Sequence, residues 1–127
     1  MEYGISKTVN LTYEQAIEKV TEELKKEGFG VLTTIDVEET LKKKLNVDFD
    51  KYIILGACNP PSAFEALKAE EQIGLLLPCN VIVYEHNGDV KVSAFNASII
   101  NMISDNPKLT ELSKTITEKL KRVIENV

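Results

Sequence analysis

The two cysteines are the residues of this chain best suited to chemistry, because a thiolate is both a nucleophile and a metal ligand. Each stands beside an asparagine and a proline, in the segments Cys58-Asn59-Pro60 and Pro78-Cys79-Asn80. Cys58 ends an apolar stretch and precedes a predicted helix, and a helix N-terminus lowers the pKa of a thiol. One hypothesis is therefore a thiol-dependent redox or transfer enzyme. Cys58 would be its candidate catalytic residue, and Cys79 would be a redox partner or flank the same ligand.

A structural role for the cysteines is the favoured interpretation. Free cysteine is among the residue types most often buried, and buried thiols are usually inert. Cys79 also shares the alternation of Val81 and Val83, which places it on the core side of its strand. The enzyme hypothesis therefore stays an alternative to a binding domain without catalysis.

Too few other side chains are available to complete a metal or catalytic site around the thiols. His86 is the single histidine, and it lies at a predicted hairpin tip about 20 Å along the strand from Cys79. One subunit therefore cannot bring Cys58, Cys79 and His86 together. Glu65 and Glu85 fit a solvated surface better than a pair of catalytic carboxylates. We expect no metal and no cofactor, since the sequence also has no glycine-rich phosphate loop, EF-hand loop or Walker motif.

The asparagines and Gly56 indicate a different kind of site. Asn59 and Asn80 each follow a cysteine at a strand end, where their amides can lock the two loops together or offer hydrogen bonds to a ligand. Gly56 leaves room for a neighbouring backbone or for a ligand. The predicted small-molecule site consists of Gly56, Cys58, Asn59, Cys79 and Asn80.

Composition limits the classes of partner. The chain has 127 residues, 43% of them hydrophobic and 28% charged, which fits one domain at residues 1–127. The net charge of −5 and the single arginine, Arg122, argue against nucleic acids and anionic membranes, because phosphate binding needs clustered positive charge. The start of the chain lacks an apolar signal segment, and the longest apolar run is far shorter than a membrane span of about 20 residues. We therefore expect a cytoplasmic protein.

The spacing of apolar residues and the capping residues predict the elements that position the two loops. The predicted order is β-α-β-α-β-α-β-β-α. These elements are a strand at 3–9, a helix from Thr12 to Gly28, a strand at 30–35, a helix from Asp36 to Asn46, a strand at 52–58, a helix at 62–71, two strands joined at Asn87-Gly88, and a helix from Asn106 to the end.

Three of these elements carry further expectations. The strand at 52–58 is apolar on both faces, so it is buried on both sides or lies between a helix and a second subunit. Asn87-Gly88 predicts a type I′ turn, which sets Val83 opposite Val92. Residues 95–104 are strongly apolar and fit a short helix or a mobile flap. If exposed, they would form an interaction patch.

The segments Gly56-Ala-Cys-Asn-Pro-Pro61 and Ile73-Gly-Leu-Leu-Leu-Pro-Cys-Asn-Val81 resemble the DUF302 family of uncharacterised bacterial and archaeal domains. The similarity runs from the helix at Thr12 to the terminal helix. It implies a TBP-like α+β fold, in which helices pack on a mainly antiparallel sheet of about five strands, and it implies homodimers. It implies no activity. Relatives often carry Asp-Pro where this chain has Phe95-Asn96-Ala97, so no role is carried over to that position.

The first hypothesis is therefore a cytoplasmic homodimer that binds a small molecule near the Cys58 and Cys79 loops. A thiol enzyme that uses Cys58 is the second hypothesis. A structural or interaction module that uses the segment from Phe95 to Ile103 is the third.

Overall fold

The computed structural model describes residues 2–127 and contains a five-stranded sheet in the order β1-β5-β4-β3-β2. Each pair of neighbouring strands is antiparallel. The strands are β1 (Gly4–Val9), β2 (Gly30–Asp36), β3 (Tyr52–Cys58), β4 (Cys79–His86) and β5 (Asp89–Phe95). The helices are α1 (Tyr13–Lys26), α2 (Val37–Leu45), α3 (Pro60–Ala69), α4 (Ile100–Ile103) and α5 (Pro107–Glu125), with 3-10 helices η1 (Glu71–Leu76) and η2 (Ala97–Ile99). The predicted α+β fold with an antiparallel sheet is confirmed.

Local signals set the ends of several elements as predicted. The Thr12 hydroxyl accepts a hydrogen bond from the backbone N–H of Gln15, and the Gln15 side chain accepts one from the N–H of Thr12. Gly28 follows α1 with φ of 84°, a conformation that glycine adopts without steric cost. Asn87 and Gly88 both have positive φ, as the predicted hairpin turn requires. These contacts are local in sequence, which is why the sequence alone predicts them.

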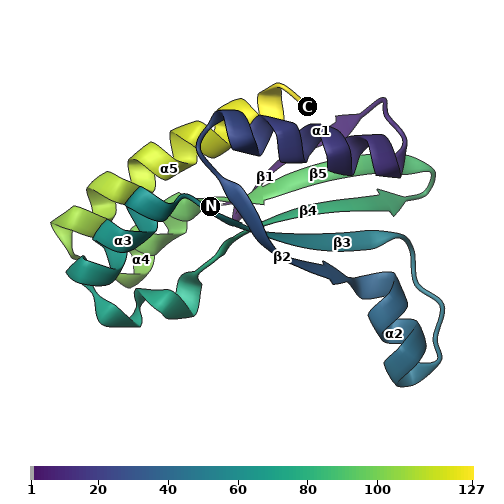
Figure 1. Cartoon of the computed structure of the whole chain (residues 1–127), viewed down its shortest axis with the longest axis horizontal. Helices are drawn as coiled ribbons and strands as arrows, with labels where there is room; N and C mark the ends of the chain where they lie inside the picture. The colour runs from purple at the N-terminus through teal and green to yellow at the C-terminus, as the bar shows by residue number, and fades with distance from the viewer. Residues whose placement is uncertain (1) are drawn as a thin grey trace.

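Helices α1 and α5 lie over one face of the sheet and bury the main core (Figure 1). The hairpin has the predicted register, with Val83 opposite Val92 and Val81 opposite Ala94. These four residues are at most 1% exposed, so the hairpin supplies the centre of this core. Among residues 2–127, no helix is both long enough and apolar enough to cross a membrane.

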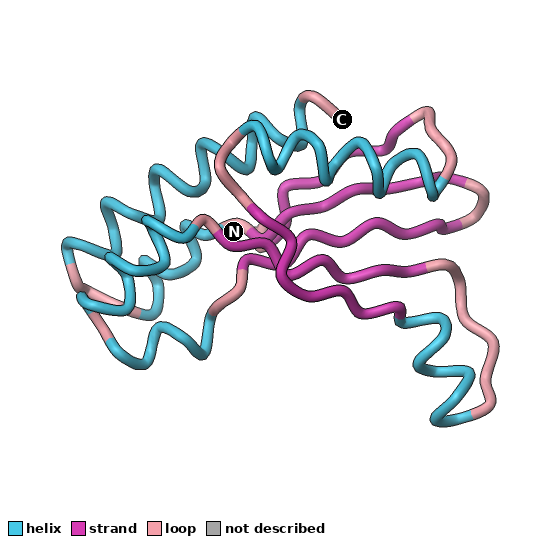
Figure 2. The backbone as a smooth tube through the Cα atoms, viewed as in Figure 1, coloured by secondary structure: helices cyan, strands magenta, loops and turns pink. Residues whose placement is uncertain are grey.

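A cluster of helical segments lies beyond one end of the sheet. Figure 2 shows α3, η1 and α4 gathered there beside the N-terminal half of α5. Ala66, Ile73 and Leu109 form a second buried core within this cluster. Within residues 95–104, Phe95 ends β5, η2 follows, and α4 is a short helix, which was one of the two predicted alternatives, while η1 was not predicted as a helix. Helix α3 starts two residues before its predicted start, because its two prolines occupy the first helical positions, and it ends at Ala69, two residues before its predicted end.

Helix α2 projects away from the other helices at the β2 end of the sheet (Figure 1). Its apolar side chains Val37, Leu41 and Leu45 recur at helical spacing, but none of them is buried, and Leu45 is 65% exposed. Val47 and Phe49, in the loop that follows, are also exposed. The chain therefore forms the predicted helix, but within residues 2–127 its apolar side is covered only in part, at Val37 and Leu41.

The face of the sheet opposite α1 and α5 is not covered by the described residues, and we call it the open face. The strand register groups its residues into rows that cross the sheet. From the hairpin turn to the other end of the strands, these are His86-Asp89, Thr8-Lys91-Tyr84-Tyr52, Ser6-Ser93-Ile82-Ile54-Ile35, and a last row that contains Gly4-Phe95 and Asn80-Gly56-Thr33. The Tyr52 and Tyr84 rings stack with centroids 5.3 Å apart. Asp89 and Lys91 are the charged residues of these rows, and both lie toward the hairpin turn, so the central row is uncharged although 28% of the chain is charged.

Candidate functional site: an apolar cavity beside the two cysteines

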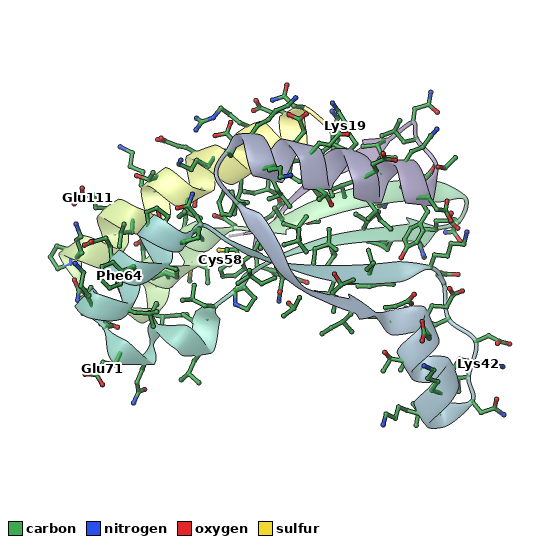
Figure 3. The ribbon with its side chains drawn as sticks, viewed as in Figure 1. Lys19, Lys42, Cys58, Phe64, Glu71 and Glu111 are labelled. Carbon is green, nitrogen blue, oxygen red and sulfur yellow. The ribbon has the colours of Figure 1, made fainter. Side chains whose placement is uncertain are left out.

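A cavity of about 340 Å³ lies between the end of the sheet and the helical cluster. Strands β2, β3 and β4 form one wall, and α3, η1, α4 and α5 form the others. Cys58, Asn59 and Cys79, three of the five predicted site residues, line it. Figure 3 shows Cys58 at the junction between the sheet and the helical cluster, far from Lys42 on the projecting α2. The structure therefore brings the two cysteine loops to a single cavity.

The walls of this cavity carry no charged side chain among the described residues. Helix α3 contributes the small residues Ser62, Ala63 and Ala66, and α5 contributes the larger Leu109 and Ile116. Ser113 also lines the cavity, but its hydroxyl is 3.1 Å from Asn101 Oδ1 and 2.9 Å from the Thr110 carbonyl oxygen. A ligand here would meet apolar surface and few free hydrogen-bonding groups.

Cys79 lies on the core side of β4, as its alternation with Val81 and Val83 predicts. Burial raises the pKa of its thiol from an ordinary 9.0 to about 11, and the nearby Cys58 thiol adds to the shift. Burial has this direction because a low-dielectric surrounding disfavours the charged thiolate. Cys79 is therefore a neutral thiol at physiological pH and a poor nucleophile.

Cys58 is half-buried and stands next to Ala57, the residue that pairs with Cys79 across strands β3 and β4. Both thiols are free. The two cysteines thus border one cavity from neighbouring strands, as the sequence predicted if β3 and β4 were adjacent. Among residues 2–127, the side chains that line the cavity with the two cysteines include no histidine and no carboxylate that could act as a general base. The single histidine, His86, lies at the hairpin tip and contacts Asn87.

The pH dependence of alkylation tests the environment of Cys79. In a Cys58→Ser variant, only Cys79 can react with iodoacetamide. With a pKa of about 11, about one thiol in a thousand is ionised at pH 8, and the rate rises about tenfold per pH unit up to pH 10. We expect no plateau below pH 10.5 when the rate is followed by mass spectrometry. A rate that is half-maximal near pH 9 and levels off by about pH 10 would show that Cys79 is as solvated as a free thiol.

Asn59 has a structural role that the sequence indicated only in part. Its side-chain oxygen accepts a hydrogen bond from the Ser62 backbone N–H at 3.3 Å, and so caps α3. Its side-chain nitrogen donates to the Glu27 carbonyl oxygen at 3.4 Å, in the turn between α1 and β2. Asn80 is exposed, and no hydrogen bond joins it to Asn59 within residues 2–127. The expectation that the two asparagines lock their loops together is wrong: Asn59 fastens α3 to the α1–β2 turn instead.

Gly56 and Asn80 pair with each other across β3 and β4 and lie outside the cavity lining. A Cβ atom at Gly56 would collide with Thr33 Oγ1 and would lie 2.8 Å from Pro78 Cγ. The space that this glycine leaves is thus filled by two side chains of the protein. Gly56 shapes the cavity indirectly, because it lets Thr33 and Pro78, two lining residues, approach the strand.

The other charged candidates lie apart from the cavity. Glu65 forms an ion pair with Lys68 at 2.9 Å on α3, and this hydrogen bond lowers the pKa of its carboxyl group. Within residues 2–127, no group of three or more His, Cys, Asp or Glu side chains is arranged to hold a metal ion. The chemistry that the cavity offers is therefore apolar contact together with two thiols.

Sequence reasoning missed most of the cavity wall. The N-terminal half of the α5 apolar stripe faces α3 and lines the cavity with Leu109, Leu112 and Ile116, which helical spacing alone does not predict. The one signal available was the small size of Ala63 and Ala66 on the inward side of α3. Small residues there let helices pack closely or leave a space, and periodicity cannot distinguish the two outcomes.

Comparison with known proteins places these features in a family. Residues 5–127 match the family model described as "Domain of unknown function DUF302". A crystal structure of an uncharacterized conserved DUF302 protein from Bacillus stearothermophilus matches with 31% sequence identity and a TM-score of 0.92. The match covers 99% of this chain and 98% of that one. Comparison with curated proteins finds no match. The chain therefore belongs to the DUF302 family of domains whose function is unknown.

Proposed function

We propose that this protein binds an uncharged, apolar small molecule in the cavity beside Cys58 and Cys79. The observation that carries the proposal is a cavity of about 340 Å³ whose lining includes no charged side chain. Small-molecule sites are typically cavities of roughly 300–1,000 Å³ lined mainly by apolar groups. A charged ligand would lose its hydration in this cavity without gaining a partner of opposite charge.

The volume of the cavity limits the size of the ligand. An engineered apolar cavity of about 150 Å³ holds benzene. The present cavity of about 340 Å³ has roughly twice that volume, which suits two or three aromatic rings or an alkyl chain of medium length. The ligand class is therefore a compact hydrocarbon-like molecule with few polar atoms.

Two fluorescent compounds with the same ring skeleton test the proposal. N-phenyl-1-naphthylamine is uncharged, and 8-anilino-1-naphthalenesulfonate adds one sulfonate to it. We expect saturable fluorescence enhancement with the uncharged compound at one site per chain, and affinity at least about tenfold lower for the sulfonate, because no cation lines the cavity. Equal affinity for both compounds, or no saturable binding of the uncharged one, would contradict the proposal.

We further propose that a second copy of the chain covers the open face. A solvated face of an antiparallel sheet normally carries polar residues, whereas the centre of this one carries Ile54, Ile82, Tyr52 and Tyr84. Protein interfaces are enriched in aromatic residues and depleted of charge at their centre. The two apolar faces of β3 are explained if α1 and α5 cover one and a subunit covers the other.

Charge on α2 favours a second copy over an unrelated partner. The first turn of α2 carries Glu38 and Glu39, and its last turn carries Lys42, Lys43 and Lys44. Where two copies of a helix pack across a two-fold axis that is perpendicular to them, they run antiparallel, and the acidic end of each then faces the basic end of the other. The exposed side chains of Leu45 and Phe49 would supply the apolar part of this contact.

We place the protein in the cytoplasm. Both cysteines are free, and thiols stay reduced in that compartment.

A further inference from the structure

We infer that ligand binding and dimerisation are coupled, because the second copy on the open face closes the cavity along its β2 side. The inference rests on the proposed function and adds the partner that completes the site. It means that the apolar ligand binds the dimer more tightly than the monomer.

The cavity reaches the open face around the end of the sheet. Ala57 and Cys79 line it from the covered face, whereas Thr33 lines it from the open face. Pro78 also lines the cavity and packs where a side chain of Gly56 would point. The cavity therefore has a rim made of open-face residues.

This rim is continuous with the apolar centre of the open face. Thr33 pairs with Gly56, and two residues further along β2, Ile35 pairs with Ile54. Ile35 is 49% exposed and is therefore available to a partner. Because Ile35 is two residues from Thr33 along β2, a subunit that buries Ile35 and Ile54 also lies beside the rim of the cavity. The surface that we assign to the partner and the rim of the cavity both lie on the neighbouring strands β3 and β2, so they are adjacent.

Leu32 shows that the rim is incomplete in one copy of the chain. It lines the cavity and yet is 69% exposed. The strand register shifts between Val31 and Thr33, and such irregularities change the direction of the side chain that they contain. Covering a large aliphatic side chain that is otherwise exposed to water is favourable in free energy, because apolar surface is removed from water. The second copy supplies that surface and excludes water from the bound ligand.

Coupling of this kind is reciprocal. If dimerisation raises the affinity for the ligand by some factor, saturating ligand raises the affinity between subunits through the same interaction. We expect a factor of about five or more, which is the lower end of the usual range for coupled sites.

The experiment measures the affinity for N-phenyl-1-naphthylamine over a dilution series that crosses the dimer dissociation constant. It uses the wild-type chain, an Ile54→Lys variant and a Thr115→Lys control on the exposed side of α5. Ile54 lies on the open face and outside the cavity lining. We expect wild type and Thr115→Lys to lose affinity about fivefold or more on dilution, and Ile54→Lys to show the weaker affinity at every concentration. Sedimentation with and without the compound measures the reciprocal effect.

The outcomes separate this inference from the proposed function. Saturable binding whose affinity is the same at every wild-type concentration overturns the coupling and leaves the ligand site intact. A wild-type chain that stays monomeric at all concentrations also overturns it. Absence of binding in every variant contradicts the proposed function itself. The wild-type dilution series decides the matter even if Ile54→Lys does not fold.

Discussion

Replacing Ala63 by phenylalanine is expected to weaken binding of N-phenyl-1-naphthylamine at least about tenfold, which corresponds to about 1.4 kcal/mol. Ala63 lies on α3 and lines the cavity opposite the larger side chains of α5. A phenyl ring at this position would occupy space that the ligand needs. Fluorescence titration of the two proteins measures the effect.

The stability of the Ala63→Phe variant separates loss of the site from loss of the fold. Filling a cavity commonly raises the free energy of unfolding by about 0.5–2 kcal/mol, so the melting temperature should stay the same or rise. Glu65→Phe is the matched control, because Glu65 lies on the same helix outside the cavity lining. If Ala63→Phe folds normally and binds as tightly as the control, the ligand occupies some other place.

The Ile54→Lys change is expected to raise the dimer dissociation constant about a hundredfold or more, which corresponds to about 2.7 kcal/mol. Ile54 lies in the central row of the open face, between Ile82 and Ile35. A two-fold interface would contain two copies of the new ammonium group, each removed from water in a central row that carries no acidic side chain. Sedimentation velocity over a range of concentrations measures the change.

The control for this prediction is Thr115→Lys, which adds the same charge at an exposed position of α5. It should leave the dissociation constant within about a factor of two of the wild-type value, since surface substitutions rarely exceed about 0.5 kcal/mol. Dimers that persist in Ile54→Lys, with an unchanged dissociation constant, would show that the subunits associate through another surface.

Much of the fold was predictable because its signals are local. The capping box at Thr12, the left-handed Gly28 and the Asn87-Gly88 turn each depend on residues within a few positions of one another. The register between β4 and β5 followed from the turn, because a two-residue hairpin leaves one pairing available. Alternation then placed Cys79 on the core side of its strand.

The cavity was not predictable because it arises where elements distant in sequence fail to fill space. Its walls combine β2, α3, η1 and α5, and their separation depends on packing rather than on the spacing of residues within any one element. Gly56 illustrates the difficulty. Its lack of a side chain did indicate a close approach, but the groups that approach are Thr33 and Pro78, from two other segments.

The sequence showed apolar residues that one copy of the chain leaves partly exposed, but it did not show which element or molecule covers them. The stripe of α2 and the two apolar faces of β3 are ordinary signs of burial, and one copy of the chain buries neither fully. Residues 95–103 show the same limit: Ile100 packs on the core, whereas Met102 and Ile103 are exposed. The interaction module that was predicted from this segment remains a prediction.

The location of a bound apolar molecule tests the central claim most directly. Methyl groups of alanine, leucine and isoleucine can be observed by NMR while N-phenyl-1-naphthylamine is added. The largest shifts are expected at Ala63, Ala66, Leu109 and Ile116, which line the cavity from α3 and α5. Shifts confined to Leu75, Leu45 or other exposed residues outside the cavity, with those four methyl signals unchanged, would contradict the assignment of this cavity as the binding site.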